Sequence, residues 1–135
     1  MKCVTRGAIS RLCASITGNK SNTRALTRIE YDLLDNPARV TDALGRDAFL
    51  KYDALGRLIE LRDPEHAKPT RFSYDPNDNL TGLDDPTGMT SYVYDELDRV
   101  KEILLPKQLG SIKYGYDLAG RVTSLNYPDG TVVQY

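Results

Sequence analysis

The chain has 135 residues, enough for one domain of ordinary size, and its formal net charge at pH 7 is −1. A charge so close to zero creates no long-range field that would attract nucleic acid or an anionic membrane, so neither is predicted as a partner. No run of about 18 apolar residues is present, and the sequence therefore predicts no membrane span.

Residues 1–28 differ in composition from the rest of the chain. They contain basic residues but no acidic residue, no tyrosine and no proline. Arg11 interrupts the apolar patch at residues 8–16, so a secretory signal peptide is not predicted. We expect a basic, poorly ordered N-terminal segment. An organelle transit peptide, a tail that binds phosphate backbones and a shifted reading frame are the alternatives.

Two cysteines, Cys3 and Cys13, lie in this first segment, and the rest of the chain has none. Their ten-residue separation fits no spacing of zinc ligands, and the single histidine, His66, is distant in sequence. The sequence thus favours two free thiols and predicts no metal site.

A Tyr-Asp pair recurs through the remainder of the chain, residues 29–135. The five pairs start at Tyr31, Tyr52, Tyr74, Tyr94 and Tyr116, at intervals of 21, 22, 20 and 22 residues. A fixed period near 20 residues predicts an array of structural repeats, and five copies exceed the minimum of about three that such arrays need. We therefore assign residues 29–135 to five repeats.

Each repeat begins with a predicted strand that ends at its tyrosine, counted here as position 0. Position −2 is apolar or aromatic in all five repeats, so positions −2 and 0 share one face of a strand. The aspartate at +1 is expected to form an Asx-turn that ends the strand. Position +4 is Gly or Asp in every repeat, which predicts a left-handed residue in this turn.

A second strand follows, with apolar residues at +6 and +9. A spacing of three places both on one face only if a β-bulge lies between them. Proline at +12 and glycine near +14 mark the return turn in most repeats. The predicted fold is all-β: antiparallel two-stranded units that form a curved sheet, with the tyrosines packed inward. On that expectation Tyr52→Ala costs about 3 kcal/mol or more, as aromatic truncations in cores do.

No arrangement of catalytic or ligand residues stands out. His66 lies in a polar loop without a nucleophile motif nearby. The run from Asp75 to Asn79 contains oxygen ligands but also Pro76, and it lacks the terminal glutamate of a calcium loop. The sequence therefore predicts no catalytic, cofactor-binding or metal-binding residues, no cofactor and no enzymatic activity.

Two heptapeptides, Tyr52–Leu58 and Tyr116–Val122, closely resemble the YD repeat of Rhs (rearrangement-hotspot) proteins, insecticidal toxin-complex C components and teneurins. The resemblance covers about residues 29–135. It implies a non-enzymatic scaffold, a fragment of a hollow Rhs-type toxin shell that encloses or presents a toxin domain. It also implies a secreted or cell-surface location, and further YD repeats or a toxin domain as partners.

Two alternatives stay open beside the shell. The chain is also interpreted as a carbohydrate- or protein-binding surface module, because exposed tyrosines can stack on sugar rings and exposed edge strands can self-associate. Bacterial members of the family resemble self-cleaving aspartyl proteases around an Asp-Pro-x-Gly-Leu segment, and Asp85–Met89 is similar to it. Asp85 and Pro86 occupy the same repeat positions as Asp63 and Pro64, so we expect an ordinary turn there.

Overall fold

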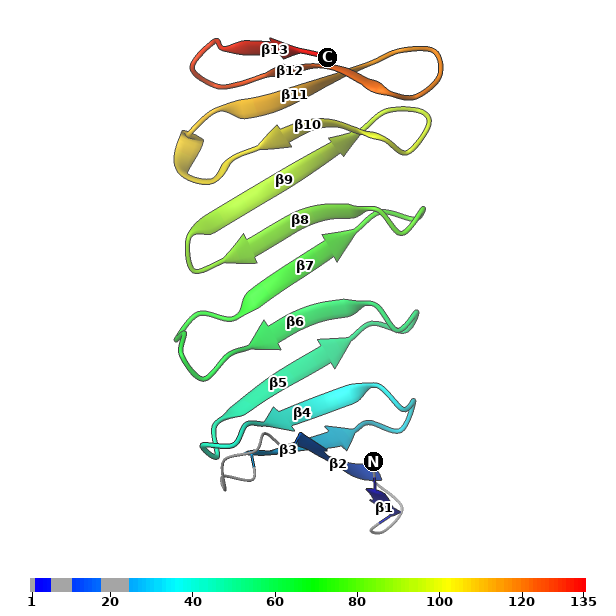
Figure 1. Cartoon of the computed structure of the whole chain (residues 1–135), viewed down its shortest axis with the longest axis vertical. Coiled ribbons are helices and arrows are strands. Elements are labelled where there is room, and N and C mark those ends of the chain that lie inside the picture. Colours follow the sequence, from blue (N-terminus) through cyan, green and yellow to red (C-terminus); the bar gives the residue numbers. More distant parts are fainter. Residues whose placement is uncertain (1, 6–10, 18–24) are drawn as a thin grey trace. The chain divides into compact units, whose positions relative to one another are not determined.

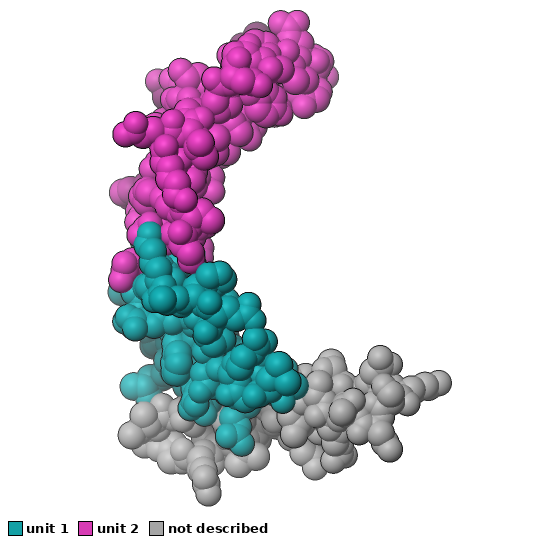
Figure 2. Space-filling view, turned by 90° about the vertical axis from the view of Figure 1, so that its left-hand side faces the viewer, with its two compact units in different colours: residues 1–70 teal, residues 71–135 magenta. Residues whose placement is uncertain are grey.

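The computed structural model describes the backbone of residues 2–5, 11–17 and 25–135, and the side chains from Thr27 onward. The chain divides into two compact units, residues 1–70 and 71–135, which Figure 2 distinguishes by colour. Each unit is a single antiparallel sheet in which strands pair in chain order (Figure 1). The all-β prediction is confirmed.

The described residues of the first unit form six strands that follow one another in chain order. Their bounds are β1 Lys2–Thr5, β2 Arg11–Thr17, β3 Ala25–Tyr31, β4 Pro37–Thr41, β5 Asp47–Tyr52 and β6 Leu58–Arg62. The repeats starting at Tyr31 and Tyr52 supply the hairpins β3–β4 and β5–β6.

The second unit contains seven strands and one short helical turn, η1. Their bounds are β7 Thr70–Tyr74, β8 Leu80–Asp85, β9 Gly88–Tyr94, β10 Val100–Leu104, η1 Pro106–Gln108, β11 Ser111–Tyr116, β12 Val122–Asn126 and β13 Val132–Gln134. The other three repeats form β7–β8, β9–β10 and β11–β12. The described residues hold no helix that is long and apolar enough to cross a membrane.

The predicted β-bulge is present in all five hairpins. In the second repeat Tyr52 pairs with Leu58, whereas Lys51 pairs with Glu60, so one extra residue lies in the return strand. The same register shift occurs in the hairpins of the other four repeats. Positions −2, 0, +6 and +9 therefore share one face of the sheet, which we call the tyrosine face.

The opposite face, formed by positions −3, −1, +8 and +10, carries charged cross-strand pairs. Lys51 Nζ lies 3.2 Å from Glu60 Oε1, and Lys113 Nζ lies 3.7 Å from Glu102 Oε1. In both pairs the two residues are register partners on adjacent strands. Because the lysine of each pair is more than half exposed, each pair contributes little to stability on its own.

The expectation of an inward-packed tyrosine core is corrected by the structure. All five repeat tyrosines are half-buried, and no large side chain of residues 27–135 is fully buried. The physical reason is that each unit is one layer of sheet, so each face is covered only by its own neighbouring side chains.

Part of the N-terminal prediction falls outside the described residues, namely residues 1, 6–10 and 18–24. The described parts of that segment form β1, β2 and the start of β3, which begins at Ala25. The division into residues 1–28 and 29–135 stays a prediction.

Candidate functional site

The most strongly conserved chemistry within the chain's own repeats lies in the five turns that follow the tyrosines, residues 32–36, 53–57, 75–79, 95–99 and 117–121, here called the YD turns. In the second one, the Asp53 N–H donates to the Arg57 carbonyl at 2.9 Å, and the Gly56 N–H donates to the Asp53 carbonyl at 3.0 Å. These two bonds define a three-residue hairpin loop that ends in a left-handed residue.

The +4 residue has the predicted positive φ in every YD turn. The angles are Asp35 63°, Gly56 77°, Asp78 68°, Asp98 57° and Gly120 80°. Only glycine, asparagine and aspartate adopt this region at low cost, which explains the restricted choice at this position.

The aspartate at +1 accepts three hydrogen bonds within its own turn. Asp53 Oδ1 accepts from the N–H groups of Leu55 at 2.9 Å and Arg57 at 3.0 Å, and Oδ2 accepts from Arg57 Nε at 2.7 Å. The backbone bond from Arg57 is the main cause that lowers the pKa of the Asp53 carboxyl. The predicted Asx-turn is therefore confirmed, and its charge is neutralised locally.

Sequence reasoning missed the role of position +5. Asn36, Arg57, Asn79, Arg99 and Arg121 each donate a side-chain bond to the second carboxylate oxygen of their own turn. The available signal was the constant pairing of an acid at +1 with a side-chain donor at +5.

A second copy of the same turn was also missed. Residues 42–46 repeat the letters of residues 53–57, and Asp42 accepts bonds from the Leu44 and Arg46 N–H groups and from Arg46 Nε. The first repeat therefore uses this turn at both ends of its return strand β4. An exact five-letter match eleven residues away was sufficient to find it.

Within the second unit, each repeat is joined to the one before it by side chains. The Tyr94 hydroxyl donates to the Leu80 carbonyl at 2.9 Å, and the Tyr116 hydroxyl donates to the Val100 carbonyl at 2.7 Å. Both acceptors stand at position +6 of the preceding repeat. Burial is the main cause that raises the pKa of both tyrosines.

The turns of the second unit also contact one another. Asp98 Oδ1 accepts from Asn79 Nδ2 at 2.8 Å and from Asn77 Nδ2 at 3.1 Å, both in the preceding turn. Arg99 stacks over the ring of Tyr116 in the following repeat, with its guanidinium carbon 4.4 Å from the ring centroid. The repeated polar groups thus connect one repeat to the next.

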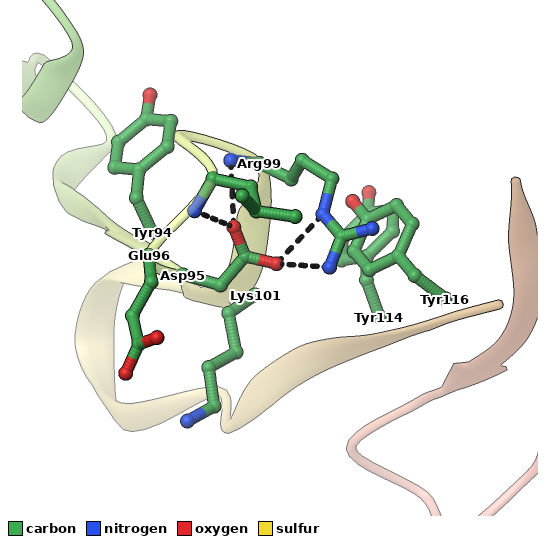
Figure 3. A pocket seen from close by; sticks show the side chains of 8 residues that line it. Tyr94, Asp95, Glu96, Arg99, Lys101, Tyr114 and Tyr116 are labelled. Carbon is green, nitrogen blue, oxygen red and sulfur yellow. Dashed lines mark hydrogen bonds and ion pairs between the residues drawn. The ribbon is translucent and has the colours of Figure 1, made fainter. Parts of the chain in front are cut away.

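A groove of about 480 Å³ lies at the junction of the last two repeats (Figure 3). It is lined by Tyr94, Asp95, Glu96, Leu97, Arg99, Lys101, Tyr114 and Tyr116. The Arg99 guanidinium lies between the Asp95 carboxylate and the two aromatic rings of β11. Those rings, Tyr114 and Tyr116, are nearly parallel at 16°, with centroids 6.5 Å apart.

The segment that resembles a self-cleavage site forms the turn between β8 and β9. Asp85 pairs with Gly88 across this hairpin, and Asp85 Oδ1 accepts from the Thr87 N–H at 2.7 Å and the Thr87 hydroxyl at 2.6 Å. The predicted turn is therefore present at this segment.

Elsewhere, His66 is exposed, with Nδ1 3.7 Å from Asp63 Oδ1. Across the described part of the chain, no group of three or more His, Cys, Asp or Glu residues is arranged to hold a metal ion.

Comparison with known proteins identifies the repeats. The family model of the RHS Repeat matches residues 31–68, 52–88, 74–108 and 94–132. A crystal structure of TcdB2-TccC3 without its hypervariable C-terminal region is similar, with a TM-score of 0.66 and 20% identity over 87% of this chain and 7% of that chain. A Photorhabdus luminescens Tc holotoxin pore with a substituted TccC3 gives a TM-score of 0.68, 20% identity and the same coverage.

The search of curated proteins found no match. This chain spans only 7% of each of the two structures it resembles, and at 20% identity that likeness shows the fold alone. The four family matches together extend from residue 31 to residue 132, across all five YD turns. The chain belongs to the RHS repeat family.

Proposed function

We propose that this chain is a non-enzymatic wall segment of an RHS-type toxin shell, which encloses or presents a toxin domain. The observation that carries the proposal is the use of the repeated polar groups. The aspartates accept bonds inside their own turns, and the hydroxyls of Tyr94 and Tyr116 hold the preceding repeat. Such groups form the turns and join neighbouring repeats. Because they are already hydrogen-bonded in these roles, they are poorly suited to proton transfer or nucleophilic attack.

The comparisons support the toxin setting. Both matched structures contain TccC3, and the name of one describes a hypervariable C-terminal region that was removed from it. Since this chain covers 7% of either chain, further repeats and a toxin domain are its proposed partners within a larger shell. A secreted or cell-surface location belongs to the same proposal.

A chimeric shell tests this function. Residues 29–135 would replace the structurally aligned strip of the TcdB2-TccC3 chain, with a protease-sensitive reporter in place of the toxin. We expect the reporter to resist added protease. The matched control carries alanine at all five YD-turn aspartates, Asp32, Asp53, Asp75, Asp95 and Asp117, and should lose that protection. A chimera that shows a β-rich circular dichroism spectrum but leaves its reporter accessible would refute the wall role.

The non-enzymatic part has its own test. Purified chain incubated at neutral and mildly acidic pH should keep its intact mass, because the Asp85 carboxylate already accepts hydrogen bonds from Thr87 within its own turn. A fragment ending at Asp85 would overturn this part of the proposal, and Asp85→Asn would identify the responsible group.

A glycan-binding surface is the second candidate, and the groove of Figure 3 is the observation that favours it. Aromatic faces with nearby charged and hydroxyl groups suit a ligand that combines an apolar ring face with polar edges. Binding on a glycan array should be abolished by Tyr114→Ala. Tyr127→Ala, at an exposed tyrosine outside the groove, should leave it unchanged. Equal effects of the two variants would exclude the groove as the binding site.

A further inference from the structure

We propose that the residues at positions +5 and +4 of neighbouring YD turns form a pairing site, which selects the kind of repeat that can follow another. The +5 residue uses part of its side chain to hold the aspartate of its own turn, and it directs the rest toward position +4 of the next repeat. The backbone at +4 admits glycine or aspartate, and the preceding repeat then decides between these residues and a basic one.

The junction of the third and fourth repeats contains a complete pair. Asn79 Nδ2 donates to Asp75 Oδ2 of its own turn at 3.1 Å and to Asp98 Oδ1 of the next turn at 2.8 Å. Asn77 Nδ2 also donates to Asp98 Oδ1, at 3.1 Å. An amide nitrogen carries two hydrogens, so one side chain can serve both carboxylates at once. The carboxylate at +4 is thus held by the turn before it.

The junction of the fourth and fifth repeats has the same arrangement, with glycine at +4. Asp95 Oδ2 lies 2.7 Å from Arg99 Nε and 2.6 Å from Arg99 Nη2. The third nitrogen, Nη1, lies 3.8 Å from the place that a Cβ at Gly120 would occupy. A guanidinium carries donors on all three nitrogens, so Nη1 can bind a second carboxylate. The space at Gly120 therefore fits an acidic side chain.

The first unit contains a third example and an internal control. Asn36 Oδ1, at +5 of the first repeat, lies 3.9 Å from the place of a Cβ at Gly56, which is at +4 of the second repeat. In the copied turn 42–46, no described atom beyond the adjacent residues lies within 4 Å of the place of a Cβ at Gly45. The two turns have the same five letters, and φ is 77° at Gly56 and 80° at Gly45. The contact at +4 therefore comes from the preceding YD turn.

The pairing also indicates which partner fits against the fifth YD turn. Arg121 Nε donates to Asp117 at 2.8 Å, but 80% of the Arg121 side chain is exposed, compared with 29% for Arg99. The partner that fits this surface is a YD repeat with glycine or aspartate at +4, because a basic residue there would face the guanidinium. This partner rests on the proposed function, in which further repeats belong to the shell. The pairing within the chain rests on the contacts alone.

The test substitutes residue 120 in the full 135-residue chain and uses Gly45 as the matched position. Both glycines have a φ of 80°, follow an aspartate by three residues and precede an arginine, so a substitution strains both backbones alike. Of the two, only Gly120 faces a +5 side chain. The variants are Gly120→Asp, Gly120→Lys, Gly45→Asp and Gly45→Lys, each measured by thermal melting at low salt and at about 1 M salt.

We expect Gly120→Asp to melt about 2 °C or more above Gly45→Asp at low salt, and Gly120→Lys to melt below Gly45→Lys. The change of sign between aspartate and lysine separates charge from crowding. Both differences should shrink at high salt and disappear when Arg99→Ala is added. In a carboxyl NMR titration, the group introduced by Gly120→Asp should have a lower pKa than that introduced by Gly45→Asp, because the guanidinium favours the ionised form.

Three results would overturn the proposal. The first is a Gly120→Asp variant that melts no higher than Gly45→Asp, and the second is a difference that survives Arg99→Ala. The third is an equal loss for aspartate and lysine at residue 120, which would indicate crowding instead of pairing. These results are distinguishable from a failure of the proposed function, because reporter protection in the chimeric shell can fail while the pairing within the chain holds.

Discussion

Replacing Tyr116 with phenylalanine removes one hydroxyl group and leaves the ring in place. In the folded chain that hydroxyl donates to the Val100 carbonyl at 2.7 Å, which connects the fifth repeat to the fourth. A neutral hydrogen bond contributes about 0.5 to 1.5 kcal/mol net. Both groups are half-buried, so the carbonyl left behind can recover part of its hydration. We therefore expect Tyr116→Phe to lower the free energy of unfolding by about 1 kcal/mol.

The neighbouring Tyr114 provides the matched control. It lies on the same strand and face, it is also half-buried, and its ring is parallel to that of Tyr116. No hydrogen bond to a protein group involves its hydroxyl among the described residues. Tyr114→Phe should thus change stability by less than about 0.5 kcal/mol, the usual range for surface substitutions.

Urea titrations followed by far-UV circular dichroism and tyrosine fluorescence measure both variants against the parent chain. Tyr94→Phe is a second test, because its hydroxyl makes the equivalent bond to the Leu80 carbonyl. Costs that are the same for Tyr116 and Tyr114, within about 0.3 kcal/mol, would show that the bond between repeats does not stabilise the array.

Three further predictions concern the turns and the sheet edge. Folding lowers the pKa of the Asp53 carboxyl, so this group stabilises the folded chain fully above its unfolded pKa of about 3.9 and loses that effect as the pH falls through its folded pKa. The urea midpoint should therefore drop below about pH 4, and Asp53→Asn should weaken this pH dependence. Gly110→Ala should lower the melting temperature more than Gly130→Ala, because both have positive φ but only the first would place a Cβ 2.6 Å from Pro128. Equal shifts would contradict that contact. Sedimentation should show concentration-dependent self-association through β13, and Gln134→Pro, which removes a backbone N–H that points away from β12, should reduce it.

The repeat unit itself was predictable because its determinants are local. The positive φ at Gly56, the Asx-turn of Asp53 and the bulge after Leu58 each follow from residue type and spacing within seven positions. The contacts between repeats were harder to predict. The bonds from Tyr116 to Val100 and from Asn79 to Asp98 depend on how one hairpin is placed beside the next, which periodicity alone does not specify.

The largest error concerned burial. Repeat positions occupied by Tyr, Leu and Val suggest a closed hydrophobic core. That assumption led to an expected loss of about 3 kcal/mol in the free energy of unfolding for Tyr52→Ala. The structure instead shows Tyr52 half-buried in a single layer, with burial and the charge of Asp32 raising the pKa of its hydroxyl. Because Tyr52 keeps part of its surface in water, we expect Tyr52→Ala to cost less than a truncation in a closed core.

The same single layer explains why the turns carry so much of the specific bonding. A sheet with no second layer obtains little stability from side chains enclosed on all sides, so its order must come from groups that fix each reversal and connect it to the next. Asp53 and Arg57 provide the first function, and the pairing of Arg99 with Tyr116 provides the second. The tyrosine hydroxyl bonds have the same form at two successive junctions, Tyr94 to Leu80 and Tyr116 to Val100, so adding repeats extends the array without a new kind of interface. That property suits a wall, whose size is set by the number of repeats rather than by the volume of a core.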